Sequence, residues 1–311
     1  MNNILIICGP TSSGKTSLSL KICEKFNGEI ISADSRQIYK YMDIGTGKVP
    51  INSDIKIKKH NNYWEFNGVK IWGYDLVKPD EYYSAYDFAL FALNKTRELI
   101  EKGKKVFLTG GTGFYIDLFT GRKKPARIQP DFKLRKELEK LSLEELQEQL
   151  TSLNLDEYNR IDDNNPIRLI RAIEKEISDF PMTPPLPYLD NSNFYYVGLN
   201  GPRDFLYHKA DLWLENVWKN GLLQEVRKLI KMGFLNSRKL RGLIYSTVLD
   251  YFDNKLAEED AIQRAKFDIH HYIRRQLTWF RKNKHIKWFD INEDDFEEKV
   301  CNNINVWINK S

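Results

Sequence analysis

The segment Gly9–Thr16, GPTSSGKT, constrains this chain more than any other feature of its sequence. It matches the pattern G-x-x-x-x-G-K-[ST] and stands between a short apolar run, Ile4–Cys8, and a helix-compatible stretch, Lys15–Phe26. A strand, this loop and a helix in that order are the context in which the pattern forms a phosphate-binding P-loop. The sequence therefore predicts an α/β fold with a phosphate site at the end of its first strand.

The residue types in this segment each suit phosphate binding. Glycine at both ends lets the backbone curl so that successive N–H groups face a phosphate, and the helix N-terminus adds partial positive charge. Lys15 can reach the phosphate oxygens, and the hydroxyl of Thr16 can hold Mg²⁺, which is the expected cofactor. The predicted diphosphate- or nucleotide-binding residues are Gly9, Pro10, Thr11, Ser12, Ser13, Gly14, Lys15 and Thr16.

Short apolar runs recur along the chain with helical patterns between them, which favours a mostly parallel sheet with flanking helices. The stretch 131–177 breaks this alternation, because it is charged, rich in Leu and Glu, and spaced like two or three amphipathic helices. We interpret residues 120–189 as an all-helical insertion domain within a P-loop, kinase-like catalytic core of residues 1–119 and 190–311. The expected strands are Ile4–Cys8, Glu29–Ser32, Lys105–Thr109 and Phe194–Leu199, the expected long helices are 204–232 and 258–282, and the candidate linker is the proline-rich segment 178–193.

The bulk composition bounds the function only loosely. Lys and Arg number 48 against 43 Asp and Glu, and this excess is too small to establish a polyanion partner by itself. The three cysteines are isolated, with no CxxC pair, so we expect a reducing compartment and neither structural zinc nor disulfides. The N-terminal apolar run is far shorter than the ~20 residues of a membrane helix. A cytoplasmic protein without a membrane partner is therefore expected.

A P-loop binds phosphates but does not define which bond breaks. The simplest expectation is a nucleotide kinase or NTPase, which needs an acidic magnesium ligand and usually an arginine over the transferred phosphoryl group. Asp34 follows the second expected strand, in SADSRQIY, at the edge of the sheet where ligands bind in this architecture. From its position alone, this carboxylate could be a magnesium ligand, a substrate base or a cap for the next turn.

Further sequence blocks after the P-loop restrict the reaction. In chain order they are SADSRQIYKYMDIGTGK (32–48), YSAYDF (83–88), GGTGFYIDLF (110–119), NPIRLIRAIE (165–174), GPRDFLY (201–207) and QLTWFRK (276–282). Together they resemble the bacterial tRNA dimethylallyltransferase (IPP transferase) family over nearly the whole chain, and the D-S-x-Q-x-Y and M-D-I-G-T blocks are distinctive. The resemblance implies transfer of a dimethylallyl group from dimethylallyl diphosphate to N6 of the adenosine next to the anticodon, position 37, in tRNA.

The resemblance also implies how the parts would be used. In the family the P-loop holds a diphosphate leaving group rather than ATP, and the helical insertion clasps the anticodon stem-loop. A monomer is expected.

The chemistry of such a transfer assigns roles to particular residues. The N6 lone pair of adenine is delocalised into the ring, so it needs a reactive carbon, which an allylic diphosphate supplies. Lys15, the P-loop amides and magnesium on Thr16 would stabilise the leaving diphosphate. Arg203, at the position of the family's diphosphate-contacting arginine, would add a forked donor. Its alternative role is that of a solvated residue near a helix start.

Proton removal and the reaction channel depend on three more side chains. As the C–N bond forms, the N6 proton becomes strongly acidic, so a carboxylate of ordinary pKa suffices as the base. Asp34 fits this role, as the family's aspartate does. Thr11 and Thr112 would line the reaction channel like their counterparts in the family. The hydroxyl of Thr112 could instead cap the helix that follows Gly110 and Gly111.

A base inside a folded anticodon loop must be extruded to react, which requires stacking surfaces and phosphate contacts. Arg168 and Arg171 lie three residues apart and would share a helix face. A basic stretch near the C-terminus, interleaved with Trp279 and Phe280, suits an RNA surface, although such a stretch can also be a solvated face over core aromatics. The predicted tRNA contacts are Asp34, Ser35, Arg36, Gln37, Arg168, Arg171, Arg241, Tyr245, Arg274 and Arg281.

Two sites depart from the family's pattern. Trp72 and Gly73 stand where a His-His pair is typical, and Ile244 and Ser246 replace the glycine and the basic residue of a Gly-Tyr-Arg or Gly-Tyr-Lys motif. Both sites face RNA in the family, so the acceptor is less constrained than the donor. The alternatives are an isopentenyltransferase acting on free adenine nucleotide, a P-loop nucleoside or nucleotide kinase, and a weakly catalytic RNA-binding relative. The helical insertion argues against the first of these.

Overall fold

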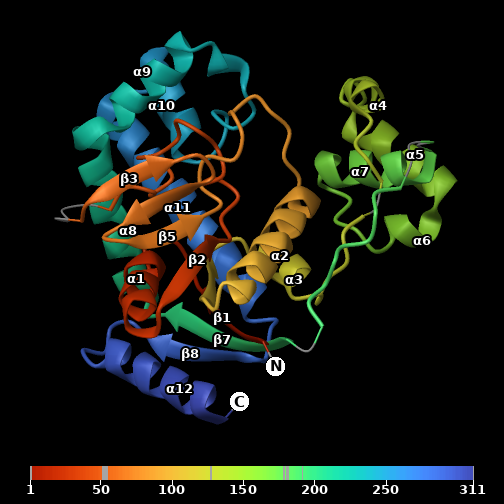
Figure 1. The fold of residues 1–311 in the computed structure, drawn as a ribbon. Helices are drawn as coiled ribbons and strands as arrows, with labels where there is room; N and C mark the ends of the chain where they lie inside the picture. Colours follow the sequence, from red (N-terminus) through yellow and green to blue (C-terminus); the bar gives the residue numbers. More distant parts are fainter. Residues whose placement is uncertain are drawn as a thin grey trace. The chain divides into compact units, whose positions relative to one another are not determined.

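The computed structural model describes residues 2–50, 55–126, 128–177, 179, 182–190 and 192–310. Within these residues, one eight-stranded sheet has the strand order β3-β4-β5-β2-β6-β1-β7-β8. Figure 1 shows β7 and β8 side by side at one edge of this sheet. The strands from β5 to β8 in that order pair in parallel, whereas β3, β4 and β5 form an antiparallel meander at one edge. The predicted α/β class with a mostly parallel sheet is confirmed.

The elements have the following bounds. The strands are β1 (Asn2–Cys8), β2 (Gly28–Ser32), β3 (Ile57–His60), β4 (Tyr63–Phe66), β5 (Val69–Trp72), β6 (Lys105–Gly110), β7 (Ser192–Asn200) and β8 (Ile286–Asp290). The helices are α1 (Lys15–Phe26), α2 (Ala85–Glu101), α3 (Gly113–Phe119), α4 (Phe132–Leu138), α5 (Leu143–Leu153), α6 (Leu155–Tyr158), α7 (Pro166–Ile177), α8 (Arg203–Val217), α9 (Leu223–Lys231), α10 (Ile244–Phe252), α11 (Glu258–Phe280) and α12 (Phe296–Lys310).

The register of the central strands brings three loops to one edge of the sheet. In β1 the residues Ile4 to Cys8 are buried, as expected for a strand between two parallel neighbours. Cys8 lies opposite Gly110 of β6 and Gly198 of β7. The loops that follow β1, β6 and β7 therefore start side by side. The strand β2, which precedes Asp34, pairs with β6 and is one strand away from β1.

The single helix predicted over residues 204–232 is wrong. Helix α8 ends at Val217, and α9 begins at Leu223 after an irregular segment. Within that segment Gly221 has φ +131°, outside the helical region. A Cβ at this glycine would lie 2.6 Å from the side chain of Ile44, so a close contact with another loop accompanies the break.

The strands β3, β4, β5 and β8 were not predicted. Each has only four or five residues, and β3 is mostly exposed and basic. Alternation over so few residues gives a weak signal, and these strands lie toward the two edges of the sheet, where fewer positions are buried.

The chain divides into two compact units. Residues 1–123 and 187–311 form the larger unit, which contains the sheet, and residues 124–186 form the smaller one. The described residues of the smaller unit make the helices α4 to α7 and contribute no strand to the sheet. Their apolar centre is Leu138, Leu146, Leu150, Leu169, Ile170, Ala172 and Ile173. Within the predicted linker, Ser178, Phe180, Pro181 and Asn191 lie outside the described residues.

A buried carboxylate joins two helices of the smaller unit. Glu174 in α7 is fully buried and accepts hydrogen bonds from the guanidinium of Arg135 at 2.8 Å and from the backbone N–H of Asp131 at 2.6 Å. Arg171 also contacts it. Burial alone would raise the pKa of Glu174, but the two arginines hold it below its ordinary value. No helix of the described chain has the length and hydropathy needed to cross a membrane.

Candidate functional site

A cavity of about 440 Å³ lies in the larger unit, where the loops at the carboxyl edge of the sheet meet. Cavities of this size accommodate small organic ligands. One part of its wall is polar and is formed by Thr11, Ser12, Gly14, Lys15 and Thr16 of the P-loop, together with Asp34, Arg36 and Gln37. The rest is largely apolar and includes Leu20, Ile30, Val49, Ile55, Ile71, Tyr74, Trp213, Leu243, Ile244 and Ile269. The site can therefore take a ligand that has a phosphate end and an apolar end.

The P-loop has the curled backbone that the sequence predicted. Gly9 has φ +149°, and a Cβ there would lie 2.5 Å from the carbonyl oxygen of Leu199. Gly14, with φ +82°, turns the chain into α1. The buried hydroxyl of Ser13 donates to the carbonyl of Pro10 at 2.8 Å and closes the loop. Only glycine fits at the first position without displacing β7.

Lys15 places an ammonium group at the polar end of the cavity. Its Nζ donates to the carbonyl oxygen of Pro10 at 2.6 Å. Burial lowers the pKa of Lys15 to about 8, and the nearby charge of Asp34 offsets part of this effect. A bound anion would favour the charged form of the lysine, so the site is suited to a ligand that brings negative charge.

Asp34 and Thr112 lie at the ends of neighbouring strands. The Oδ1 atom of Asp34 accepts the backbone N–H of Arg36 at 2.8 Å, which forms a tight turn, and Asp34 is part of the cavity wall. The hydroxyl of Thr112 accepts the N–H of Ser35 at 3.0 Å and donates to its Oγ at 3.3 Å. Although Thr112 is the N-cap residue of α3, its side chain caps no described N–H of that helix. It therefore joins two loops, and unlike Thr11 it is not part of the cavity wall.

Gln276 in α11 connects the P-loop to the loop after β6. The sequence alone did not indicate this role. Its Oε1 accepts the N–H of Thr11 at 2.8 Å, and its Nε2 donates to the carbonyl of Gly111 at 3.0 Å. A Cβ at Gly111 would lie 2.3 Å from this Nε2, which explains the glycine there. The sequence block QLTWFRK contained the residue, but its partners lie far away in the chain.

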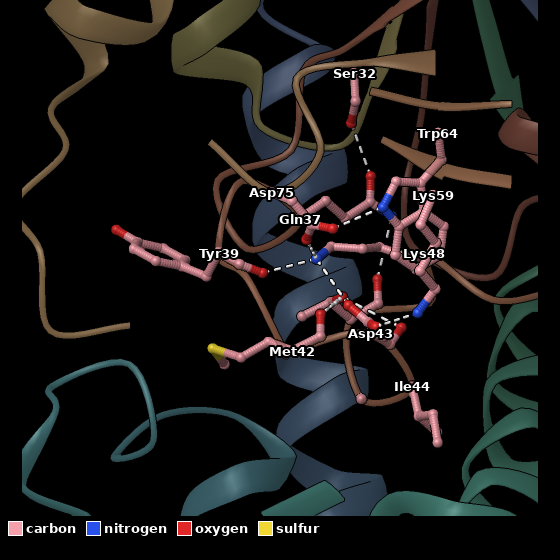
Figure 2. A network of polar contacts seen from close by, with 12 residues as sticks. Ser32, Gln37, Tyr39, Met42, Asp43, Ile44, Lys48, Lys59, Trp64 and Asp75 are labelled. Atoms are coloured by element: carbon pink, nitrogen blue, oxygen red, sulfur yellow. Dashed lines mark hydrogen bonds and ion pairs between the residues drawn. The ribbon is translucent and has the colours of Figure 1, made fainter. Parts of the chain in front are cut away.

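Lys48, which is part of the cavity wall, forms a second polar centre (Figure 2). Its side chain is fully buried, and Nζ donates to the carbonyl of Tyr39 at 2.7 Å, to Asp43 at 3.0 Å and to Asp75 at 2.6 Å. The ring of Trp64 lies 5.5 Å from the same nitrogen. Asp43 lies only five residues from Lys48, but Asp75 and Trp64 come from other segments, so the local sequence does not by itself indicate that this lysine is buried.

Several predicted RNA contacts are exposed. Arg168, Arg241 and Arg281 are exposed to solvent. Arg168 makes a long hydrogen bond of 3.5 Å to Asp162, and Arg241 makes one of the same length to Asn236. Arg203 is the exposed first residue of α8, shortly after the end of β7, and does not line the cavity.

The other predicted RNA contacts are engaged within the protein. Arg171 donates to the carbonyl of Ile128 at 2.7 Å besides its ion pair with Glu174. The remaining contacts are Arg36 to the carbonyl of Lys239 (2.6 Å), Gln37 to Ser32 (2.7 Å) and to the carbonyl of Thr46 (3.1 Å), Tyr245 to Glu225 (2.8 Å), and Arg274 to the hydroxyl of Tyr207 (2.9 Å). These side chains have a structural partner in addition to any ligand.

The positions that depart from the family's pattern have defined places. The indole N–H of Trp72 donates to Glu29 at 2.6 Å, and the ammonium of Lys95 lies 3.7 Å from the indole ring centroid. Ile244 is buried and lines the cavity, whereas the hydroxyl of Ser246 donates to the carbonyl of Leu243 at 2.8 Å. Residue 244 is therefore part of the cavity wall.

The residues at the P-loop fit a magnesium ion that a phosphate ligand brings with it. Among the described residues, no group of three or more His, Cys, Asp or Glu side chains could hold a metal ion. Mg²⁺ typically keeps several waters and binds through one or two protein oxygens and substrate phosphates. Thr16, at the start of α1 and on the cavity wall, can supply such an oxygen.

Comparisons with known proteins agree with this arrangement. The IPP transferase family model matches residues 37–283, and an isopentenyl transferase model matches residues 2–71. The chain is 36% identical to a tRNA dimethylallyltransferase of Clostridioides difficile over 318 residues, and 35% identical to that of Acetivibrio thermocellus over 320. Each alignment covers 99% of this chain and 98% of the relative.

Solved structures show the same similarity. The tRNA isopentenylpyrophosphate transferase of Bacillus halodurans superimposes with a TM-score of 0.71 at 30% identity, covering 100% of this chain and 98% of that one. The Staphylococcus epidermidis enzyme gives 0.70 at 28% identity, covering 100% and 99%. The family model matches most of the chain, and relatives with more than 30% identity match it over nearly its full length. The chain belongs to the IPP transferase family.

Proposed function

We propose that the chain transfers a dimethylallyl group from dimethylallyl diphosphate to N6 of adenosine 37 in tRNA and releases diphosphate. The observation that carries the proposal is one cavity in which a P-loop lysine, a carboxylate and an apolar wall meet. A kinase could also use both ends, with phosphates at the P-loop and a base against the apolar wall, so the relatives distinguish the two reactions. The curated relatives that this chain matches are tRNA dimethylallyltransferases.

The P-loop end would stabilise the leaving group. As the allylic C–O bond breaks, its electron pair stays with the diphosphate. The ammonium of Lys15 and the N–H groups at the start of α1 then face the added negative charge. Arg203 would add a forked donor once the ligand is present. Thr16 would hold Mg²⁺ on the cavity wall, and the ion would supply further positive charge at this end of the cavity.

Asp34 would act as the general base. The N6 lone pair forms the new C–N bond, and the nitrogen becomes cationic. Its proton passes to the carboxylate of Asp34, whose Oδ1 is already held by the turn to Arg36. Thr11 lies on the same wall, and its N–H is fixed by Gln276. This end of the cavity therefore keeps a proton acceptor at a fixed place.

The proposed binding of tRNA would use exposed arginine side chains. Arg168, in the smaller unit, and Arg241, Arg275 and Arg281, in the larger one, are exposed and suited to phosphate contacts. We assign the helical insertion to the anticodon stem-loop and expect the enzyme to act as a monomer.

Labelled substrates test the proposal directly. The protein is incubated with prenyl-labelled dimethylallyl diphosphate or with γ-phosphate-labelled ATP, each with unmodified tRNA or with AMP. The proposal expects label in tRNA only from the prenyl donor, at the nucleoside 3′ of the anticodon. Label in AMP instead would identify an isopentenyltransferase for free nucleotides. Transfer from ATP to a nucleotide would identify a kinase.

A further inference from the structure

One wall of the cavity is a short loop that a distant carboxylate holds in place. The loop is Asp43–Thr46, and Gly45 and Thr46 line the cavity. Glu225, in α9, accepts the backbone N–H groups of Asp43 at 2.7 Å and Ile44 at 2.6 Å with one oxygen, and that of Gly45 at 3.1 Å with the other. Three successive N–H groups thus point at one anion, an arrangement that proteins often use to bind phosphate.

The carboxylate of Glu225 is buried and has a further hydrogen-bond donor besides the loop. Its side chain is buried, and Oε1 also accepts the hydroxyl of Tyr245 at 2.8 Å. A Cβ on Gly45 would lie 2.6 Å from the ring of Tyr245, so the loop presses directly on α10. Without the carboxylate, three partly buried N–H groups would lose their acceptor, and each would then favour a conformation in which it reaches water.

A hydrogen bond links the 43–46 loop to the polar end of the cavity. The carbonyl of Thr46 accepts a hydrogen bond from Gln37 at 3.1 Å, and Gln37 lies three residues after Asp34. The side chain of Asp43 is fixed separately by Lys48 at 3.0 Å (Figure 2). Glu225 itself does not line the cavity. It can therefore affect the reaction only through the groups that it holds, which are the loop and Tyr245, a residue of the cavity wall.

We propose that Glu225 is a positioning residue for prenyl transfer, whose carboxylate sets the 43–46 wall of the cavity in which donor and acceptor meet. The inference rests on the proposed function, because it concerns the rate of that transfer. It predicts that loss of the carboxylate slows the chemical step while the P-loop still binds the donor.

The test compares Glu225→Gln with the matched control Glu258→Gln. Glu258 lies on helix α11 and accepts the indole N–H of Trp218 at 3.0 Å, and among the described residues it makes no hydrogen bond to the loop. Single-turnover transfer to tRNA is measured at saturating donor, alongside donor affinity and the hydrogen exchange of peptides covering residues 43–46.

For Glu225→Gln we expect a roughly 10- to 100-fold slower single turnover, the size of effect that an ångström-scale displacement produces. Donor affinity should stay near wild type, exchange in the loop should increase, and the control should change neither. A single-turnover rate near that of wild type would overturn the proposal. So would equal losses of rate and donor affinity, since these indicate general destabilisation. If Glu225→Gln does not fold, Glu225→Asp, which keeps the charge but shortens its reach, takes its place. A wild type that transfers no prenyl group would reject the proposed function, and exchange in the loop would still decide whether Glu225 holds it.

Discussion

At the scale of single residues, Lys15 provides the charge that a diphosphate would meet first. Lys15→Ala removes an ammonium from the P-loop and nothing from the exposed cations. We therefore expect a loss of roughly 10²–10³-fold in transfer rate, similar to losing one oxyanion-hole donor, with tRNA affinity near wild type. Filter binding of tRNA and single-turnover kinetics measure the two quantities. Equal losses of activity and tRNA affinity would give Lys15 a structural role instead.

The pKa of Lys15 also predicts how donor binding depends on pH. Burial lowers this pKa to about 8, whereas a bound diphosphate favours the charged form and raises it. Donor binding therefore takes up a proton above pH 8, and donor affinity should decrease as the pH rises from 8 toward 10. Calorimetry in buffers of different ionisation enthalpy reports this proton uptake. The Lys15→Ala variant is the control and should show no such uptake, because the remaining groups are unchanged.

The position of Asp34 is compatible with two roles, general base and magnesium ligand, which a substitution can distinguish. If it is the base, Asp34→Asn should keep donor binding and slow prenyl transfer by roughly 10²-fold or more, since the N6 proton then lacks an acceptor. If it is a magnesium ligand, donor affinity and rate should fall together and recover with added Mg²⁺. Single-turnover transfer across a magnesium titration distinguishes these outcomes. A rate within a few-fold of wild type would remove Asp34 from the mechanism.

At the scale of elements, helix α7 presents two arginines with different environments. The sequence predicted that Arg168 and Arg171 share a face and a role, since they lie three residues apart. In the structure Arg168 is exposed, whereas Arg171 pairs with the buried Glu174. One turn of helix therefore combines an exposed arginine, whose ion pair with Asp162 spans 3.5 Å, with an arginine that pairs with a buried carboxylate.

These environments predict opposite phenotypes. Arg168→Ala should weaken tRNA binding and reduce the log–log salt slope by roughly one unit or slightly less, with stability unchanged. Arg171→Ala should lower the free energy of unfolding by roughly 1–3 kcal/mol, because a buried carboxylate loses a charged partner. Salt titrations of tRNA binding and urea unfolding measure these effects. If Arg168→Ala keeps the wild-type slope, that residue belongs to a solvated face.

At the scale of the whole molecule, the two compact units suggest a division of work. The P-loop and Asp34 lie in the larger unit, and Arg168 lies in the smaller one. Changes that share no partners usually contribute additively to free energy. We therefore expect the losses in kcat/KM of Lys15→Ala and Arg168→Ala to add within about 0.5 kcal/mol in the double variant. A larger deviation would show that RNA and donor sites are coupled.

The sequence by itself determined the features whose physical causes lie close together along the chain. The apolar run before Gly9, the glycines of the P-loop and the pattern of α1 act within some two dozen residues, so the α/β class and the curled backbone of the P-loop followed from local rules. The strands β2, β6 and β7 were likewise predicted, because their buried runs are continuous. The order of the blocks then indicated the family.

Only the tertiary structure decided which side chains form the walls of the site. Thr11 and Gln276 are 265 residues apart, and Asp43 and Glu225 are 182 apart. In sequence, Glu225 looks like a solvated carboxylate on the amphipathic helix α9, and Lys48 looks like one of many surface lysines. Their burial depends on how distant loops converge on them. A buried charge is stable only where the fold supplies its hydrogen bonds, and those partners are chosen by the path of the whole chain.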